Sequence, residues 1–372
     1  MDLTLTQADL VRALGAVQGV VERRPNQQAL SHALLTAREG QLQVTATDQE
    51  LTVIHRFPAE VAQPGSACVH AGHLFQVARN LPDRPVHLES QENHGLVVDA
   101  APAHFRLVGL PPDDFPALPA FESTANMTVK AAGLLKVIDR TLFAIPTDDR
   151  RYGLNGGHLE SIEDLDGQAF LRMVTTDGSR LCYSGIPYEG EFGMGRHMLV
   201  PRKALAEVRK LLEGSGEHVD IAFGERAATF TVGSSVLHTR LVDGEFPAYR
   251  SVLPQSYLRR VVVNRAAFRD ALRRVALEAI DQANTIRLRF AEEEALVSAR
   301  GLDQGEARHP VPIQLEGEPI EMGFNVRFFL EVVNCIDEED LMLELGEALS
   351  PCTVRAPEDE STLFIIMPIR LD

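Results

Sequence analysis

The side chains that could do acid–base or metal chemistry are scattered along this 372-residue chain. Asp148 and Asp149 are adjacent in "TDDRRY", but neighbours in sequence rarely point into one site, and no matching acid or base motif follows. His70 and His73 could chelate a metal ion, yet the sequence places no third ligand near them. The run Glu292–Glu294 is typical of a solvated turn between strands. We therefore expect no catalytic residue, no metal site and no cofactor.

The cysteines and the known enzyme motifs lead to the same expectation. No GxSxG, HExxH, Walker or GxGxxG pattern occurs in a convincing setting. The chain starts without the basic and apolar regions of a signal peptide and has no run of about 18 apolar residues, so we expect a cytoplasmic protein with no membrane contact. The cysteines are far apart without CxxC spacing, which predicts reduced, partly buried side chains: Cys68, Cys182, Cys335 and Cys352.

The elements that would position any site repeat three times along the chain. An alternating strand followed by an amphipathic helix begins at Leu3, Met127 and Val261, in "LTLTQADLVRALGAV", "MTVKAAGLLKVIDRT" and "VVVNRAAFRDALRRV". A second triplet of the same kind begins with "VHAGHLFQVARNL", "VPRKALAEVRKLL" and "FNVRFFLEVVNCI". Segments between the helices alternate in the manner of strands. We predict an α+β protein of three repeated domains, at residues 1–122, 123–254 and 255–372.

The charge of the chain is divided unevenly between helices and the rest. The net charge is -17, from 36 basic and 53 acidic residues, which argues against holding nucleic acid by phosphate neutralisation alone. The six expected helices nevertheless sum to +5 and everything else to -22. Lys203 and Lys210 project away from the apolar stripe of one helix, as Arg269 and Arg273 do on another. These faces are either ordinary solvated surface or a surface that converges on a polyanion.

Several longer motifs identify a family. The segments "ERRPNQQAL", "RRYGLNG", "TTDGSRL", "LVDGEFPAYRSVLP", "GFNV" and "IIMPIRL" occur in this order across the whole chain. Together they resemble the bacterial sliding clamp, the beta subunit of DNA polymerase III. The resemblance implies clamp domains of the processivity fold in a head-to-tail homodimeric ring, with helices lining a central hole and antiparallel sheets outside. Such a ring holds duplex DNA by topology and without sequence specificity, so an acidic chain suffices.

The family's partners and its DNA contacts follow from the same resemblance. It implies a non-catalytic, nucleoid-associated processivity factor that tethers the DNA polymerase III alpha subunit, the clamp loader and other proteins with a clamp motif. For Arg151 and Tyr152 the alternative is a loop packed on the strand that starts at Leu154, and Gly153 weakens any expectation of base stacking there. The implied DNA contacts are Arg24, Arg79, Arg151, Tyr152, Arg202 and Lys203.

The resemblance also implies a pocket for short peptide motifs between the second and third domains. A peptide groove needs apolar walls, an adaptable methionine and a few polar anchors. Ser179 and Ser251 replace residues that are often larger or basic in the family, so the rim would prefer a different motif. The matching positions are Leu154, Thr176, Gly178, Arg180, Leu181, Pro247, Val252, Leu349, Pro351, Ile365, Ile366, Met367, Pro368, Ile369 and Arg370.

The ring-closing surface implied by the family matches Phe105 and Leu107 in the first domain against Ala276 and Leu277 in the third. Ala276 is smaller than the aliphatic residue common there, which would weaken each interface by about 1 to 3 kcal/mol. A specialised or duplicate clamp is one alternative. A repeat-built interaction scaffold that never encircles DNA is another, although it would not explain basic charge on helix faces.

The chain ends on an apolar run, "TLFIIMPIRLD", which is unusual for a terminus. Thr362–Ile366 is predicted to be the last strand of the third domain. Pro368 cannot donate to a strand ladder, so the chain should leave the sheet there. We expect Met367–Arg370 to lie along the pocket beside Leu154 and Pro247.

Overall fold

The computed structural model describes residues 1–22, 26–118, 122–148, 153–163, 167–192, 197–213, 216–279, 284–301 and 305–371. Its contacts divide the chain into two compact units. Unit 1 comprises Met1–Leu135, Tyr188–Gly193 and Lys203–Leu241, and unit 2 comprises Lys136–Pro187, Met194–Arg202 and Val242–Asp372. Among these described segments, none forms a helix long and apolar enough to cross a membrane.

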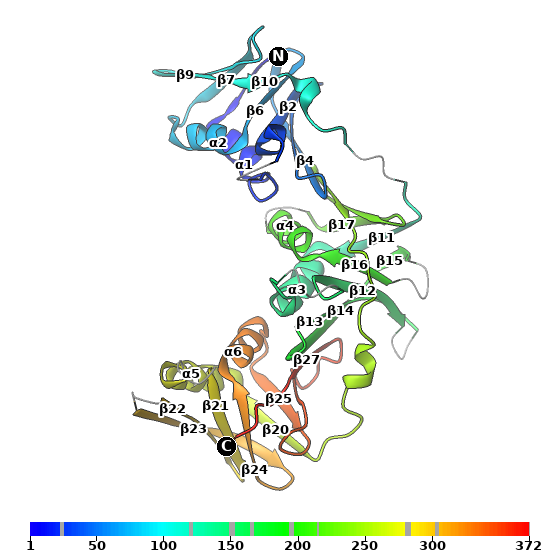
Figure 1. Ribbon diagram of the computed structural model, residues 1–372, viewed down its shortest axis with the longest axis vertical. Helices are drawn as coiled ribbons and strands as arrows, with labels where there is room; N and C mark the ends of the chain where they lie inside the picture. The colour runs from blue at the N-terminus through cyan, green and yellow to red at the C-terminus, as the bar shows by residue number, and fades with distance from the viewer. Residues whose placement is uncertain are drawn as a thin grey trace. The chain divides into compact units, whose positions relative to one another are not determined.

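Unit 1 contains two antiparallel sheets (Figure 1). The first has the strand order β5 (Glu60–Gln63), β1 (Asp2–Thr6), β7 (Pro85–Ser90), β8 (Leu96–Ala100) and β9 (Ala103–Leu107). The second has the order β10 (Gly109–Leu110), β6 (Gly65–His70), β2 (His32–Arg38), β3 (Gln41–Thr47), β4 (Leu51–Pro58), β19 (Ser235–Arg240), β18 (Ala227–Val232), β17 (His218–Phe223), β11 (Ala125–Lys130) and β15 (Glu189–Glu191).

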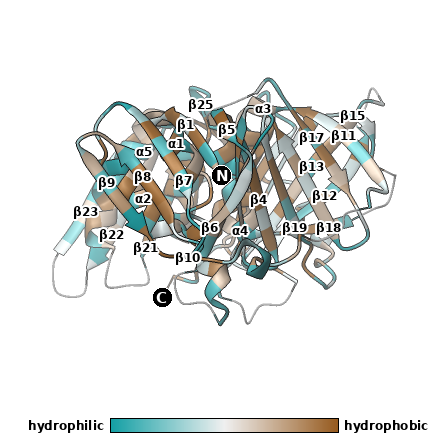
Figure 2. Cartoon of the chain, turned by 90° about the horizontal axis from the view of Figure 1, so that it is seen from above, coloured by the Kyte–Doolittle hydropathy of each residue, from teal (hydrophilic) through white to brown (hydrophobic). Residues whose placement is uncertain are grey.

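Unit 2 is built on one long antiparallel sheet. Its order is β16 (His197–Pro201), β12 (Gly156–Glu163), β13 (Ala169–Thr176), β14 (Arg180–Pro187), β27 (Thr362–Ile366), β26 (Cys352–Arg355), β25 (Asp340–Leu345), β20 (Arg259–Asn264), β23 (Gly305–Glu316), β22 (Glu294–Gly301), β21 (Thr285–Ala291) and β24 (Ile320–Asn325). Figure 2 shows hydrophobic and hydrophilic residues alternating along strands, as sheets with one buried face require.

Each expected strand-and-helix pair is present in the structure. The α-helices of the described residues are α1 (Gln7–Gly15), α2 (Ala71–Asn80), α3 (Ala131–Thr141), α4 (Arg202–Leu212), α5 (Arg265–Val275) and α6 (Val326–Cys335), and each directly follows a strand. Side chains of Thr6, His70, Asn264 and Asn325 accept backbone N–H groups at four helix starts, which satisfies donors that the helix leaves unpaired. Short 3-10 helices are η1 (Gln28–Ser31), η2 (Pro112–Asp114), η3 (Leu142–Ala144), η4 (Tyr249–Val252) and η5 (Ala276–Glu278).

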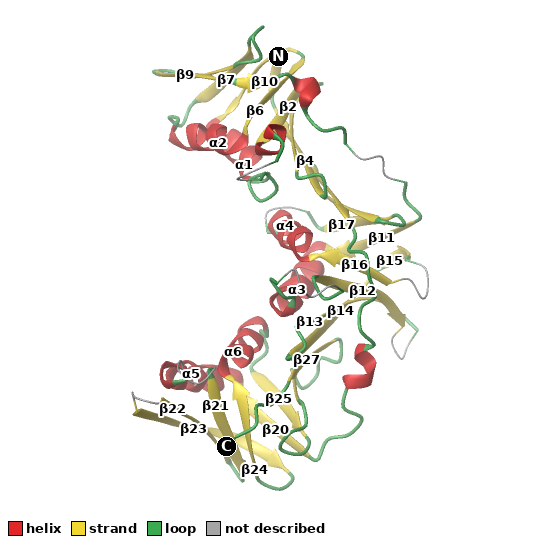
Figure 3. Ribbon diagram, in the orientation of Figure 1, coloured by secondary structure: helices red, strands yellow, loops and turns green. Residues whose placement is uncertain are grey.

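The core of unit 2 forms where α5 and α6 pack together and against the sheet (Figure 3). Phe329 on α6 meets Phe268 on α5 edge-on, with ring centroids 5.8 Å apart, and meets Phe324 on β24 at 5.1 Å. All three rings are at most 1% exposed. Aromatic pairs in this geometry add to the stabilisation that burial alone provides.

Two strand pairings connect parts of the chain that are far apart in sequence. In unit 1, β4 pairs with β19, and we call this pairing the first junction. In unit 2, β14 pairs with β27, and we call this pairing the second junction. Each sheet therefore runs continuously from one sequence repeat into the next.

Candidate functional site

Exposed apolar side chains mark the candidate site in unit 2. Among the residues that the structure describes, few large apolar side chains remain exposed, and three of them are predicted pocket positions: Val252 at 51%, Leu349 at 56% and Met367 at 40%. Exposed large apolar side chains cost solvation free energy, so their presence at predicted pocket positions favours a binding surface.

The floor of this site is a small apolar cluster on the sheet. Leu181 on β14 and Ile365 on β27 are direct cross-strand partners, and both are buried. They pack with residues that the sequence analysis did not single out. These residues are Val174, Tyr183, Phe246, Tyr249, Leu253 and Leu363. Phe246, Tyr249 and Leu253 belong to the matched segment "LVDGEFPAYRSVLP", which is their only indication in the sequence.

The turn between β13 and β14 is held by its own side chains. Thr176 donates its hydroxyl to the carbonyl of Arg180 at 2.6 Å and accepts the Gly178 N–H at 3.0 Å. Asp177 accepts the N–H groups of Ser179 and Arg180. Gly178 has φ +86°, a region that side chains disfavour, so glycine is required for this turn.

Arg180, another predicted pocket residue, is buried. It is 7% exposed, and its guanidinium pairs with Asp177 at 3.0 Å and with Glu331 of α6. It also donates to the carbonyl of Phe143 at 2.7 Å and stacks on the Phe143 and Phe328 rings. The resemblance implies that this residue belongs to the pocket, and its contacts with Asp177, Glu331 and Phe143 hold the β13–β14 turn against α6.

Other predicted pocket residues lie on loops around this floor. Leu154 follows Gly153, which has φ +82°, and a Cβ at Gly153 would lie 2.9 Å from the carbonyl oxygen of Glu245. This close approach puts the Leu154 loop beside the segment that carries Pro247. Pro351 precedes β26, whose first residue pairs with Ile366.

The C-terminal tail, Met367–Leu371, is fixed at two points. The Met367 N–H donates to the Ser179 carbonyl at 3.0 Å, and the Ile369 N–H donates to the Gly323 carbonyl on β24 at 2.7 Å. A Cβ at Gly323 would lie only 2.6 Å from Leu371 Cδ2, so glycine allows the tail to approach. The predicted last strand, Thr362–Ile366, is confirmed. The sequence did not predict that the tail beyond Pro368 would pair with β24.

A buried polar group anchors the segment around η4. Glu160 accepts the Tyr249 hydroxyl and an Arg250 Nη2–H at 2.9 Å. Burial, with this hydrogen bond, raises the pKa of Tyr249 to about 12. His158 is stacked between Phe246, at 4.7 Å, and His197, at 5.1 Å, and burial lowers its pKa to about 4.

His158, Glu160 and His197 are of types that bind metals, and their ligand atoms lie within 4.8 Å of one another. The carboxylate of Glu160 is already paired with the Arg250 guanidinium, which disfavours a second cation at this place. Pro247 lines an adjoining cavity of about 420 Å³ together with both histidines.

The predicted DNA contacts fall into two groups. Arg24, Arg151 and Tyr152 lie outside the described residues. Arg79 is exposed in the last turn of α2, with its guanidinium 5.7 Å from the centre of the Phe75 ring. Lys203 is about half exposed, contacts Asp48 and donates to the carbonyl of Val20 at 3.3 Å. Arg202 is half-buried, and its Nε has no hydrogen-bond partner in the described structure.

Much of the positive charge on the helices is neutralised locally. Lys210 pairs with Glu207 at 2.7 Å, and Arg209 pairs with Glu213 at 2.5 Å. Arg273 is exposed as predicted, and it donates to the amide oxygen of Asn334 at 3.4 Å. The basic residues on the helices therefore produce only a weak positive potential, because many of them are already paired.

Each unit contains a strand with an open edge. β9 is the terminal strand of its sheet, and the first half of β23 pairs only with β22 among the described strands. Near β9, Phe105 is half-buried and Leu107 is only 7% exposed, whereas Val108, which the sequence analysis missed, is 89% exposed. Beside β23, Ala276 and Leu277 belong to η5, and Leu277 is 67% exposed.

The residues first considered for chemistry have structural roles. His70 caps α2 by accepting the His73 N–H at 3.1 Å, Glu292 and Glu293 form the turn between β21 and β22, and Glu294 begins β22. Asp149 lies outside the described residues. The cysteines are free as predicted, and burial raises the thiol pKa of Cys68 to about 11 and of Cys335 to about 12.

Comparison with known proteins identifies the family. Models of the DNA polymerase III beta subunit match residues 1–119 as the N-terminal domain, 128–248 as the central domain and 250–370 as the C-terminal domain. The beta sliding clamp of Caulobacter vibrioides strain NA1000 is 34% identical over 374 residues and covers 100% of both chains. The beta sliding clamp of Escherichia coli K12 is 29% identical over 372 residues, again covering 100% of both chains.

Solved structures agree with these matches. A crystal structure of the C. crescentus beta sliding clamp with polyethylene glycol bound has a TM-score of 0.94 and 33% identity, covering 100% of this chain and 99% of that one. The Bartonella birtlesii clamp bound to griselimycin has a TM-score of 0.94 and 32% identity, covering 100% of both. This chain therefore belongs to the family of bacterial beta sliding clamps, the non-catalytic processivity subunits of DNA polymerase III.

Proposed function

We propose that two copies of this chain close head to tail into a ring around duplex DNA and that the ring tethers the replicative polymerase, the clamp loader and other motif-bearing partners. The proposed domains are residues 1–122, 123–254 and 255–372. In the ring, the helices line the hole and the sheets face outward.

The ring would close by joining the β9 edge of one copy to the β23 edge of the other. Unpaired strand edges readily accept another strand, and natural proteins rarely leave them free. Val108 and Leu277, exposed beside these edges, supply apolar area that would be buried on closure. Ala276 contributes little to this area, so the ring would open more readily than one with a larger aliphatic residue there.

The docking function rests on one main observation, that Val252, Leu349 and Met367 are exposed apolar side chains in segments that adjoin the buried cluster around Leu181 and Ile365 in sequence or by strand pairing. A flexible methionine at the edge of such a site adapts to different partner side chains. The turn at Thr176 and the tail at Met367 are both fixed by hydrogen bonds, so binding requires little reordering of the backbone.

The proposed hold on DNA is topological, with weak contacts from Arg79, Arg202 and Lys203. A net charge of -17 and largely paired helix cations fit a ring that slides, because strong phosphate neutralisation would anchor it.

Retention on closed circular DNA tests this proposal. The protein, loaded by a clamp loader onto a nicked circle, should stay bound at about 0.5 M salt, where simple electrostatic binding is lost. Cutting the circle once should release it. The control is a circle whose two ends, once it has been cut, are each blocked by a tightly bound protein. This blocked linear DNA should retain the clamp. Release that is independent of cutting would contradict encirclement.

A further inference from the structure

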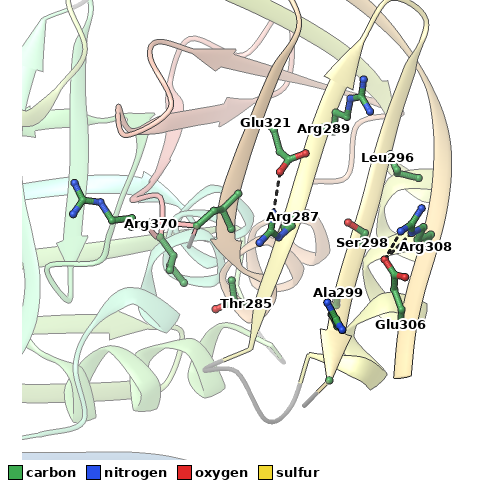
Figure 4. A pocket seen from close by; sticks show the side chains of 14 residues that line it. Thr285, Arg287, Arg289, Leu296, Ser298, Ala299, Glu306, Arg308, Glu321 and Arg370 are labelled. Carbon is green, nitrogen blue, oxygen red and sulfur yellow. Dashed lines mark hydrogen bonds and ion pairs between the residues drawn. The ribbon is translucent and has the colours of Figure 1, made fainter. Parts of the chain in front are cut away.

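The solvent face of the sheet formed by β21 to β24 carries an unusual gathering of arginines (Figure 4). Alternation on β21 turns Ile286, Leu288 and Phe290 into the core and leaves the intervening side chains on the opposite face. A cavity of about 930 Å³ opens on that face. We call its basic residues the arginine face: Arg287, Arg289, Arg300, Arg308 and Arg370.

This surface is positively charged, whereas the chain as a whole is negatively charged. Five arginines and two glutamates line the cavity, an excess of three positive charges in a protein of net charge -17. Glu321 pairs with Arg287 at 3.2 Å, and Glu306 pairs with Arg308 at 2.6 Å. Arg289, Arg300 and Arg370 are exposed and have no ion pair with any residue that the structure describes.

The spacing of these arginines matches an extended peptide. Arg287 and Arg289 are two residues apart on one strand, so their Cα atoms are about 6.8 Å apart. Side chains on one side of an extended peptide repeat at the same distance. Arg287, Ser298 and Arg308 lie in one row across three strands. Guanidinium groups bind carboxylates through two parallel hydrogen bonds, so alternate carboxylates on such a chain would find a partner at each step.

The tail connects this face to the docking site. Met367 is exposed at the docking site, and Arg370, about 10 Å further along an extended chain, lines the arginine cavity. A partner chain whose apolar residues lie at Met367 could continue directly over the arginines. Glu306 and Glu321 would repel the uniform charge of a nucleic-acid backbone, whereas a peptide can place neutral residues opposite them.

We propose that the arginine face binds an acidic, extended segment of a partner protein, with carboxylates on alternate residues. This proposal deepens the docking function and rests on it, but its test avoids the apolar pocket. The probe is a fluorescein-labelled (Glu-Ser)6 peptide, with (Gln-Ser)6 as the neutral control. Binding to the full-length protein is followed by fluorescence anisotropy at low and moderate salt.

The peptide (Glu-Ser)6 should bind more tightly as salt falls, and (Gln-Ser)6 should not bind. Arg289→Glu/Arg300→Glu should weaken (Glu-Ser)6 binding by about tenfold or more, since each reversal replaces attraction by repulsion. Arg289→Gln/Arg300→Gln should weaken it less, in the same direction. The matched control Arg38→Glu/Arg226→Glu changes the net charge equally at exposed positions of unit 1 and should leave binding within about twofold.

Two outcomes would overturn the proposal. One is equal loss of binding in the control variant, which would mean that only net charge matters. The other is tighter binding of a labelled 12-nucleotide single strand that the same two substitutions abolish, which would assign the face to nucleic acid. Because the probe has no apolar side chains, its failure would leave the apolar docking site and the ring untouched.

Discussion

The two junctions join consecutive repeats by the same backbone pairing but differ in what surrounds it. At the first junction, β4 and β19 are supported by a hydrogen bond of 2.7 Å between His55 and Ser235 and by an exposed pair, Arg240 with Glu50 at 3.4 Å. At the second junction, two arginines are buried, one at the start of β14 and one on α3 that donates to the first residue of β27. The difference indicates that the junction under the docking site is held in one geometry, while the other depends on strand pairing and apolar packing.

Arg140 is the first of these buried arginines. It is 3% exposed and donates to Asp359 and to the Thr362 hydroxyl, both at 2.8 Å, and to Glu338 at 3.3 Å. Burial alone would raise the pKa of Asp359, but the hydrogen bond from Ser361 and the charge of Arg140 together lower it. Arg180 is the second, and it connects β14 to α6. Both therefore tie the central repeat to the last one.

The largest expected effect comes from breaking the second junction. Arg140→Ala should lower the free energy of opening β27 by about 3 kcal/mol, because it leaves the carboxylate of Asp359 without its cationic partner and the Thr362 hydroxyl without its donor. Arg240→Ala, the matched change at the first junction, should cost less than about 0.5 kcal/mol, since that pair is exposed. Hydrogen exchange of β27 and β19 measures both. Similar losses in the two variants would remove the contrast between the junctions.

A smaller effect is expected when the charge of the second arginine is kept but its shape is changed. Arg180→Lys should lower the free energy of unfolding by about 2 kcal/mol, because an ammonium group cannot reach Asp177, Glu331 and the Phe143 carbonyl together. It should also weaken binding of the polymerase alpha subunit several-fold by loosening the β13–β14 turn. Urea unfolding and surface plasmon resonance give the two values. Unchanged affinity with lowered stability would show that Arg180 does not position the turn.

The smallest effect concerns pH and both units. Burial lowers the pKa of His158 in unit 2 and of His55 in unit 1 to about 4, from an ordinary value of 6.5. Below pH 6.5 these two histidines are therefore protonated in the unfolded chain, whereas in the folded chain they stay neutral until the pH falls to about 4. The contribution of each neutral histidine to stability is fully present above pH 6.5 and is lost as pH falls toward 4, and at pH 5.5 His158 accounts for about 1 kcal/mol of this loss.

His158→Gln should flatten the stability profile of unit 2 between pH 6.5 and 4 without changing that of unit 1. His55→Gln should have the converse effect. Urea unfolding at several pH values, followed by hydrogen exchange of amides in each unit, gives a separate stability profile for unit 1 and for unit 2. A profile that both substitutions leave unchanged would mean that other groups set the acid sensitivity.

The sequence was sufficient to predict the local elements. The repeat beginning at Leu3, Met127 and Val261 became β1–α1, β11–α3 and β20–α5, because strand alternation and helix periodicity are properties of neighbouring residues. The terminal strand at Thr362–Ile366 followed from the same reasoning. The family's fold followed from motifs that matched along the whole chain.

Long-range partners could not be predicted in this way. Nothing in the alternation of β4 indicates that it pairs with β19, 184 residues later by the first residue of each strand. The motif around Arg180 gave its place in the chain but not its partners Phe143, which belongs to η3, and Phe328 and Glu331, which belong to α6. Lys203 looked like a free cation because Asp48 is distant in sequence. The arginine face could not be predicted for the same reason, because its arginines come together only when strands β21 to β24 pair in the correct register.

The tail Met367–Leu371 has a thermodynamic consequence because it is held at Ser179 on one side and at Gly323 on the other. The same few residues border both the docking site and the arginine face, so a ligand at either place restricts the same backbone. The second ligand then meets a chain that has already lost much of its conformational entropy. Linkage requires this cooperativity to be reciprocal. Binding of an acidic segment at the arginine face would therefore raise the affinity of the docking site by the same factor by which docking raises the affinity of the arginine face.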